Sequence, residues 1–409
     1  MTLAALESLS FGLTRLAAAA TAAGHRLVLL TGDRGVYRHE LATVPPDALD
    51  VVDVDTSDRE AVRRALARLP ALAGLVDTTD TWSVPVAELA AELGLPGPEP
   101  ETVRLLRDKS RVRRALHGAG LSRGTSVPLA PGPGGAARVV EKVGLPAVLK
   151  DSAGTSSRAV WIAHDEEELR AALAAAAGTR LTGRLCAEPF LAGPLYSAET
   201  LSWDGTTRLL AVCGRQTSRR PAVREEAAAL PVALPPAELA AVERWVGRVL
   251  AVAGHRRGFA HVEFAHTTHG PELVEINRRI GGALIAEALC RTLRTDVYAA
   301  LTDVTLGRRP ALLDAPHRTD GPAVAFVLVY ADRPGVLDGW TGLDGLTAFP
   351  GAPEWYPTRA PGDPVPSVDD QRGCTGMVLA EGPTAEVAQH RAWSAATTVR
   401  AVLRQDPAA

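Results

Sequence analysis

The sequence predicts an α/β fold in its first 100 residues, a parallel sheet with helices on its faces, followed by a mixed α/β and α+β region. Before residue 100, short apolar runs alternate with helix-like segments, a pattern typical of parallel sheets. After residue 145, strand-like runs follow one another across short turns, which favours hairpins. A chain of 409 residues is long enough for two or three domains.

The first 100 residues contain four strand-like runs and three helix-like segments. The apolar runs are 2–6, 26–31, 51–54 and 74–76. The helix-like segments are 13–23, which ends before Gly24 at a natural C-cap position, 58–69 with an acidic first turn, and 83–93 with a proline near its start. Ligands of such sheets bind at the carboxyl ends of the strands.

The rest of the chain continues with a basic helix over 101–117 and a loop rich in proline and glycine at 128–135. Further strands are expected at 145–150, 159–163, 185–191, 196–203, 209–213, 259–265 and 272–277. Further helices are expected at 165–177, 238–253, 281–293 and 386–403. Strands 196–203 and 209–213 flank an Asp-Gly turn and are expected to form a hairpin.

Composition excludes several classes of function. The chain is 46% hydrophobic and 22% charged with a net charge of −3, so it lacks the concentrated positive charge of nucleic-acid and membrane-surface binders. No window reaches 18 apolar residues, and the first residues do not resemble a signal peptide. The four cysteines form no CxxC pair and are expected to be reduced. These features predict a cytoplasmic protein.

Lysine and asparagine are unusually rare in this chain. Of 44 basic residues only Lys109, Lys142 and Lys150 are lysines, and Asn277 is the only asparagine. A residue kept against so strong a bias toward arginine is a better functional candidate than usual.

The segments HVEF and ELVEIN predict a metal site on one hairpin. Residues two apart on a strand face the same way, so Glu275 and Asn277 project together. With a turn near His269, Glu263 lies opposite Glu275 on that face. Two adjacent carboxylates repel unless a cation lies between them, and oxygen ligands suit Mg²⁺. The alternative is a solvated polar hairpin face.

Three further features fit a phosphate site beside that hairpin. Lys150 ends a strand and precedes DSAGTSS, whose small residues offer backbone and hydroxyl donors to phosphates. Arg279 follows the hairpin, next to Gly281 and Gly282. Glu188 in CAEPFLAG ends a strand, where its carboxylate can accept from an adenine amine. An ordinary tight turn remains the alternative for the first feature. No GxxxxGK[ST] loop is present.

In this order, these motifs resemble the ATP-grasp superfamily, and within it the carboxylate–amine ligases of the L-amino acid ligase or dipeptide synthetase type. DKSRVRRALHGAGL resembles the first lysine motif, which implies that Lys109 binds the α-phosphate side of ATP. PAVLK with DSAGTSSRAV resembles the second lysine and the glycine-rich lid, which implies nucleotide contacts from Lys150, Gly154 and Ser156.

EPFLAG resembles the adenine hinge and implies contacts from Glu188 and from the backbone through Leu191. FAHVEF and LVEINRRIGG resemble the metal and phosphate signature, which implies metal ligation by Glu263, Glu275 and Asn277 and a catalytic role for Arg279 together with Lys150. CTGMVLAEGPTAEVAQHRA resembles the C-terminal region of carboxylase- and ligase-type members.

The resemblance implies three domains. A pre-ATP-grasp α/β domain spans 1–100, an ATP-grasp domain spans 101–310 with a lid at about 120–190, and a C-terminal subdomain spans 311–409. The family often places a ribose-binding glutamate seven residues after the hinge glutamate; here that position is Leu195, and either Glu199 or another group is expected to take its place.

Side chains beyond these motifs offer substrate contacts. The segment 215–232 is expected near the acceptor site, where Arg215, Arg219, Arg220 and Arg224 either bind a substrate carboxylate or form a solvated basic loop. His261 shares the face of Glu263, and either a packed histidine or a site residue fits that position.

The implied reaction uses ATP and two Mg²⁺ ions, with Mn²⁺ as a substitute, to convert a carboxylate to an acylphosphate that an amine attacks. Two amino acids are the expected substrates, giving a dipeptide or γ-glutamyl-type amide, and a homodimer is one expected assembly. Two alternatives stay open: a purine-biosynthesis or biotin-carboxylase-like enzyme acting on formate or bicarbonate, and a non-catalytic ATP-binding pseudo-ligase or sensor.

Overall fold

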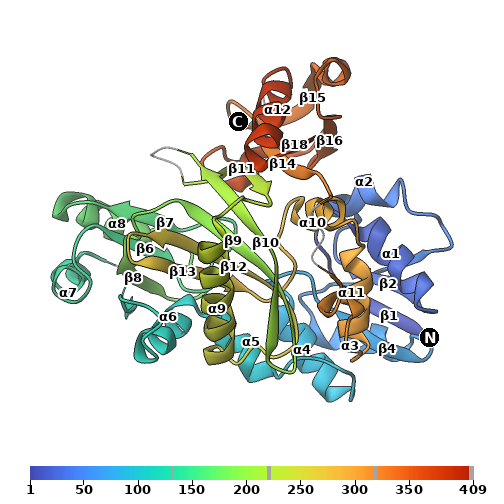
Figure 1. The fold of residues 1–409 in the computed structure, drawn as a ribbon, viewed down its shortest axis with the longest axis horizontal. Helices are drawn as coiled ribbons and strands as arrows, with labels where there is room; N and C mark the ends of the chain where they lie inside the picture. The colour runs from blue at the N-terminus through green and yellow to red at the C-terminus, as the bar shows by residue number, and fades with distance from the viewer. Residues whose placement is uncertain (131, 219–222, 317–319, 405–409) are drawn as a thin grey trace.

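The structure is a computed structural model that describes residues 1–130, 132–218, 223–316 and 320–404. A large antiparallel sheet lies at the centre, between an N-terminal α/β unit on one side and a small four-stranded sheet on the other (Figure 1). The last part of the chain adds strands to the central sheet and packs above the N-terminal unit (Figure 1). Among the described residues, no helix combines the length and apolarity needed to cross a membrane.

The N-terminal unit confirms the predicted parallel sheet. Its four strands pair in the order β3-β2-β1-β4, and every pair is parallel. The elements are β1 (Thr2–Leu6), α1 (Leu13–Ala22), β2 (Arg26–Thr31), η1 (Arg34–Tyr37), α2 (Arg38–Leu41), β3 (Leu49–Asp53), α3 (Arg59–Ala67), β4 (Leu72–Val76) and α4 (Ser83–Glu92). The carboxyl ends of these strands face the rest of the molecule through the loops that follow β1 and β4.

The predicted helix over 101–117 is instead two helices, α5 (Pro100–Arg107) and α6 (Lys109–Gly118). Asp108 between them has an extended backbone, and its carboxylate accepts from the N–H of Arg111 at the start of α6. The cap turns the chain, so that Lys109 begins a helix rather than lying within one.

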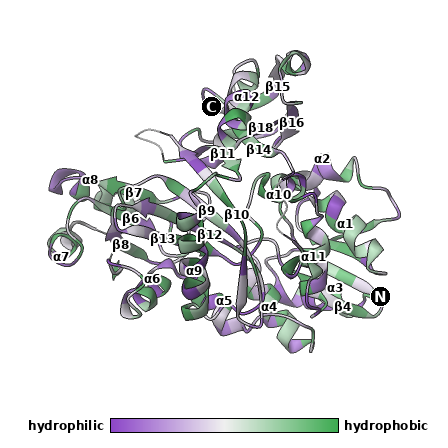
Figure 2. Ribbon diagram, in the orientation of Figure 1, coloured by the Kyte–Doolittle hydropathy of each residue, from purple (hydrophilic) through white to green (hydrophobic). Residues whose placement is uncertain are grey.

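The small sheet has the order β5-β8-β6-β7 and falls in the segment predicted as the lid. Its elements are β5 (Val127–Pro128), η2 (Pro133–Gly135), α7 (Ala136–Lys142), β6 (Ala147–Asp151), β7 (Val160–Ala163), α8 (Glu166–Ala177) and β8 (Leu185–Pro189). Hydrophobic and hydrophilic stretches are mixed along outer helices such as α8 and α9 (Figure 2), as expected of helices that cover a sheet.

The central sheet has the order β13-β12-β9-β10-β11-β14-β18-β16. It is built from β9 (Leu195–Trp203), β10 (Thr206–Thr217), β11 (Glu225–Leu230), β12 (Gly258–Thr267), β13 (Gly270–Asn277), β14 (Ala323–Tyr330), β16 (Glu354–Pro357) and β18 (Cys374–Gly382). The predicted hairpin of β9 and β10 is confirmed, with Asp204 and Gly205 both at positive φ in its turn. Because β11 pairs with β14, this sheet includes strands from both sides of residue 310, where the ATP-grasp domain was predicted to end.

The remaining elements flank these sheets: α9 (Pro236–Val252), α10 (Ile285–Leu293), α11 (Val297–Thr305), η3 (Ala311–Leu313), β15 (Gly335–Thr341), η4 (Leu343–Ala348), β17 (Pro364–Val365), η5 (Gln371–Gly373), α12 (Ala385–Ala396) and β19 (Arg400–Arg404). The predicted helix over 386–403 is therefore too long. Residues 400–404 alternate in exposure, as strand residues do, and pair with β15. They form the edge strand of the sheet β17-β15-β19.

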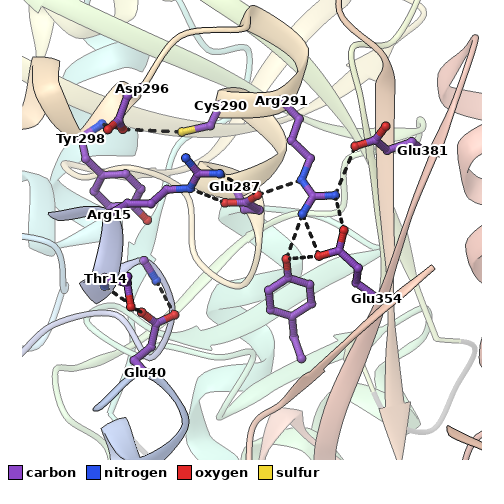
Figure 3. Close-up of polar contacts among 12 residues, drawn as sticks. Thr14, Arg15, Glu40, Glu287, Cys290, Arg291, Asp296, Tyr298, Glu354 and Glu381 are labelled. Carbon is purple, nitrogen blue, oxygen red and sulfur yellow. Dashed lines mark hydrogen bonds and ion pairs between the residues drawn. The ribbon is translucent and has the colours of Figure 1, made fainter. Parts of the chain in front are cut away.

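An ion-pair network joins the three parts of the chain around α10 (Figure 3). Arg15 of α1 donates from Nε to Glu287 of α10 at 2.6 Å. Arg291, one turn along α10, donates to Glu287 at 2.8 Å and to Glu354 of β16 at 2.7 Å. It also donates to Glu381 of β18 at 3.2 Å. Because α10 follows the predicted phosphate segment, the network fixes the position of that segment relative to both flanking units.

Candidate active site

The hairpin of β12 and β13 has the predicted register. Glu263 lies opposite Glu275, and His261 lies opposite Asn277. The Asn277 amide donates to Oε1 of Glu275 at 2.8 Å, while Lys109 at the start of α6 places its Nζ 2.9 Å from Oε2 of the same carboxylate. Two carboxylates and an amide therefore share one face of the hairpin, with the first predicted lysine beside them.

Cationic side chains neutralise the Glu263 carboxylate. Arg215 of β10 contacts it, and His261 Nε2 lies 3.2 Å away. Burial opposes ionisation, but the charges of Arg215 and His261 hold the pKa of Glu263 well below its usual range. Burial also opposes the charge of His261, yet Glu199, 2.7 Å from its Nδ1, raises the pKa of His261 to about 9. The carboxylate therefore stays ionised, as a ligand of a cation must be.

Glu199 lies behind this face. It pairs with His261 across the β9–β12 ladder and also accepts from Ser197 at 2.7 Å. The structure does not bring Glu199 to the wall of the cavity described below, whereas Leu195 lines it. The ribose contact predicted for Glu199 therefore has no support from its position.

The hinge glutamate and the second lysine form a buried cluster. Glu188 of β8 is only 2% exposed, and its Oε2 lies 2.7 Å from Lys150 Nζ of β6 and 3.1 Å from Arg113 Nη2 of α6. Burial opposes ionisation, but Lys150 and Arg113 lower the pKa of Glu188. Its Oε1 is buried without a hydrogen-bond partner, although the side chain lines the cavity. A buried acceptor of this kind needs a donor from a ligand or water.

The glycine-rich lid loop connects β6 to β7. Asp151 anchors its base by accepting from the backbone N–H groups of Ala153, Thr182 and Gly183. Ser156 has φ of 57°, a left-handed conformation that costs energy for a residue with a Cβ. Lys109 Nζ donates to the Gly154 carbonyl at 2.6 Å, so the loop contacts the first lysine.

The N-terminal unit holds the predicted catalytic arginine. Asp80, in the loop after β4, accepts from Arg279 Nε at 2.7 Å, and Asp77 contacts Arg278. No sequence motif marks these two aspartates. They lie in the loop that follows a strand of a parallel sheet, and such loops often bind ligands. This position could have identified them from the sequence.

These groups surround one cavity with a volume of about 580 Å³. Its walls include nine of the predicted site residues: Lys109, Lys150, Gly154, Ser156, Glu188, Leu191, Glu263, Glu275 and Arg279. Asn277 lies behind Glu275 rather than on the wall. Of the arginines predicted to bind a substrate carboxylate, Arg215 lines the cavity but is paired with Glu225 at 3.0 Å.

Of the other three predicted arginines, one does not line the cavity and two lie outside the described residues. Arg224 donates to Glu226 at 3.0 Å and stacks on Tyr330, with its guanidinium carbon 3.8 Å from the ring centre. Arg219 and Arg220 lie outside the described residues. Arg224 is therefore held by contacts within the segment and with β14.

The donor set fits a hard cation and a nucleotide. Glu263 and Glu275 carry carboxylates that are paired with the basic side chains of Arg215, His261 and Lys109, and the Asn277 amide lies beside one of them. The unpartnered Glu188 oxygen fits an adenine amine. Among the described residues, no cluster of three or more histidine, cysteine, aspartate and glutamate side chains is arranged to bind a metal.

Comparisons with known proteins agree with this geometry. Residues 143–287 match the ATP-grasp domain family, and residues 327–404 match the L-amino acid ligase C-terminal domain 2. The structure resembles an L-amino acid ligase from Bacillus licheniformis with a TM-score of 0.83 and 19% identity, over 99% of both chains. It also resembles a phosphoribosylglycinamide synthetase from Anaerococcus prevotii, with a TM-score of 0.74 and 14% identity over 98% of this chain and 99% of that chain.

The chain is also similar in sequence to human carnosine synthase 1, with 27% identity over 68% of this chain and 36% of that protein. It therefore spans about a third of that relative's length. Two family matches, the ATP-grasp fold and the order of the motifs agree with one another. The chain therefore contains an ATP-grasp domain over residues 143–287 and an L-amino acid ligase C-terminal domain 2 over residues 327–404, and it has the fold of the L-amino acid ligase structure.

Proposed function

We propose that this protein joins two amino acids in an ATP-dependent reaction that passes through an acylphosphate. The observation that carries the proposal is the single cavity that collects Lys109, Lys150, Glu263, Glu275 and Arg279 from the predicted nucleotide, metal and catalytic motifs. The C-terminal match to L-amino acid ligases favours amino acids over the formate or bicarbonate of the alternative reaction.

The nucleotide end of the cavity is proposed to lie between the lid sheet and the hairpin. Glu188 accepts from the adenine amine with its unpartnered oxygen, and the backbone through Leu191 reads the ring edge. Lys109 and Lys150 place point charges beside the phosphates, and Gly154 and Ser156 cover them from the lid loop.

The metal face is proposed to consist of Glu263, Glu275 and Asn277. Two Mg²⁺ ions, or Mn²⁺ in their place, would supply charge neutralisation for the β- and γ-phosphates there. For this, Arg215 must leave Glu263 and Lys109 must leave Glu275, because each now occupies one carboxylate. Both side chains are long enough to turn toward phosphate oxygens instead.

The chemical steps need positioning and charge rather than a side-chain nucleophile. One carboxylate attacks the γ-phosphorus of ATP, and ADP leaves. Arg279, held by Asp80, offsets the charge of the transferring phosphoryl group. The amine of the second substrate then attacks the acyl carbon, phosphate leaves, and an amide is formed.

The experiment that tests the proposal is a screen of amino-acid pairs with Mg²⁺ and ATP, read by ADP release and by product mass. A product with the mass of two amino acids minus water, formed together with ADP, supports the proposal. ADP release that requires bicarbonate or formate would assign the alternative reaction. ATP binding without ADP release under any of these conditions would leave a nucleotide-binding protein without turnover.

A further inference from the structure

The cavity has an apolar part that the nucleotide and metal contacts do not use. We call it the apolar chamber and define it by six cavity-lining residues: Leu9, Phe11, Ile285, Phe326, Leu328 and Met377. They come from the loop before α1, the first residue of α10, and the neighbouring strands β14 and β18. All except Leu9 are buried by the surrounding protein.

Strand register explains why these side chains share one wall. Phe326 and Leu328 are two residues apart on β14 and face the same way. Met377 of β18 lies opposite Leu328 and adjoins Tyr356 of β16. The ring of Phe11 meets that of Tyr356 edge-on, with 5.7 Å between their centres, and so closes the chamber from the N-terminal unit. The wall is built by all three parts of the chain.

Arg359 lines the same cavity just after β16. Its Nη1 donates to the Pro364 carbonyl at 2.7 Å and its Nη2 to the Arg372 carbonyl, while its Nε is buried without a partner. In the part of the chain that the structure describes, Arg113, Arg215 and Arg279 of this cavity each pair with a carboxylate, but no ion pair involves Arg359.

Burial lowers the pKa of Arg359, although the side chain remains charged at any ordinary pH. The charge of nearby Asp363 opposes this shift, but the half-buried guanidinium donates only to neutral carbonyls and its Nε remains unused. A carboxylate from a ligand would supply a direct ion pair and an acceptor for Nε.

We infer that the apolar chamber and Arg359 together bind the amine-donating substrate, an amino acid with an apolar side chain. The side chain enters the chamber and the carboxylate pairs with Arg359. The amine-donating substrate keeps its carboxylate in the product whichever carboxylate of the other substrate is activated, so a permanent positive partner suits it. The assignment of this subsite to the amine-donating substrate rests on the proposed function.

The test measures binding without turnover. Leucine, asparagine and leucine amide are titrated calorimetrically into the full-length protein with Mg²⁺ and a non-hydrolysable ATP analogue. Asparagine has nearly the shape of leucine but a polar end, and leucine amide lacks the carboxylate. We expect leucine to bind at least about 10-fold more tightly than either, because the chamber cannot solvate an amide and Arg359 needs an anion.

Variants separate the two parts of the subsite. R359Q is expected to weaken leucine binding by about 10- to 100-fold, R359K is expected to restore part of the loss, and neither should alter leucine amide binding. R333Q is the matched control, because Arg333 is an exposed C-terminal arginine that donates to the Leu403 carbonyl away from the cavity. L328N is expected to reduce the preference for leucine over asparagine.

Equal binding of leucine and asparagine, or an R359Q protein that binds leucine like R333Q, would overturn the inference. A separate screen of single amino acids with ATP and hydroxylamine, read by hydroxamate formation, reports on acylphosphate chemistry alone. Hydroxamate formation without leucine selectivity contradicts only the subsite. Leucine selectivity without any hydroxamate supports the subsite and contradicts the proposed ligase reaction.

Discussion

Lys150 Nζ lies 2.7 Å from Oε2 of Glu188. Both side chains are buried, together with that of Arg113, which also contacts Glu188. A second lysine–glutamate pair of similar length, Lys142 with Glu141 at 2.6 Å, is fully on the surface. The chain thus contains a buried and an exposed version of the same interaction.

Replacing Glu188 by Gln should lower the free energy of unfolding by about 3–5 kcal/mol, because it removes the counter-charge of buried Lys150 and leaves buried Arg113 with only the more distant carboxylate of Glu272. Glu141→Gln is the matched control and should change it by less than about 1 kcal/mol. Chemical denaturation measures both. If the two variants lose the same stability, the buried cluster does not have the role assigned to it.

Replacing Glu275 by Gln should reduce turnover by about 100-fold or more while the protein stays folded, because the transferring phosphoryl group loses charge stabilisation at the proposed metal face. The variant should also require more Mg²⁺ for half-maximal rate. Glu238→Gln, on the exposed start of α9, serves as the control and should behave as the parent protein. An unchanged Mg²⁺ requirement in Glu275→Gln would remove Glu275 from the metal face.

Replacing Asp80 by Asn should lower kcat by about 10-fold or more with little change in the KM for ATP, because Arg279 loses the charged partner that orients it. Asp47→Asn changes an exposed aspartate of the same unit and should leave kcat unaltered. Steady-state kinetics of the two variants makes the comparison. A rise in KM with constant kcat would instead place Asp80 in nucleotide binding.

Stability should fall as the pH drops below about 6.5, because burial and the nearby Arg278 lower the pKa of His255 from 6.5 to about 4. Between these two pH values, His255 is protonated in the unfolded chain but not in the folded chain. The contribution of His255 to the free energy of unfolding is therefore complete above pH 6.5 and is lost toward pH 4. It amounts to at most about 3 kcal/mol.

Denaturation curves at pH 5 and pH 7.5 measure this effect. His255→Gln should reduce the difference in unfolding free energy between the two pH values, whereas His39→Gln, an exposed histidine, should keep it. An identical pH dependence in parent and His255→Gln proteins would assign the effect to other groups.

Local patterns predicted the parts of the site that depend on local geometry. The two-residue spacing of Glu275 and Asn277 fixed one face of a strand, and the short turn determined that Glu263 lies opposite Glu275. Alternation of apolar runs and helices predicted the parallel N-terminal sheet for the same reason.

Contacts between distant segments were not predictable in this way. Asp80 and Arg279 are 199 residues apart, and they meet only because the N-terminal unit packs beside the central sheet. Arg359 stands in a loop with no periodic pattern, among many other arginines of the chain. It is distinguished by a buried, unpartnered Nε at the wall of the cavity, which only the packed structure reveals.

The most direct test of the central claim follows oxygen from the activated amino acid. The carboxylate of that substrate is labelled with ¹⁸O, and the reaction is run with Mg²⁺, ATP and the amine-donating amino acid. If the reaction passes through an acylphosphate, each released phosphate carries one ¹⁸O atom, because the carboxylate oxygen stays on phosphorus when the amine attacks. Amide formation with unlabelled phosphate, or with the label in AMP, would contradict it.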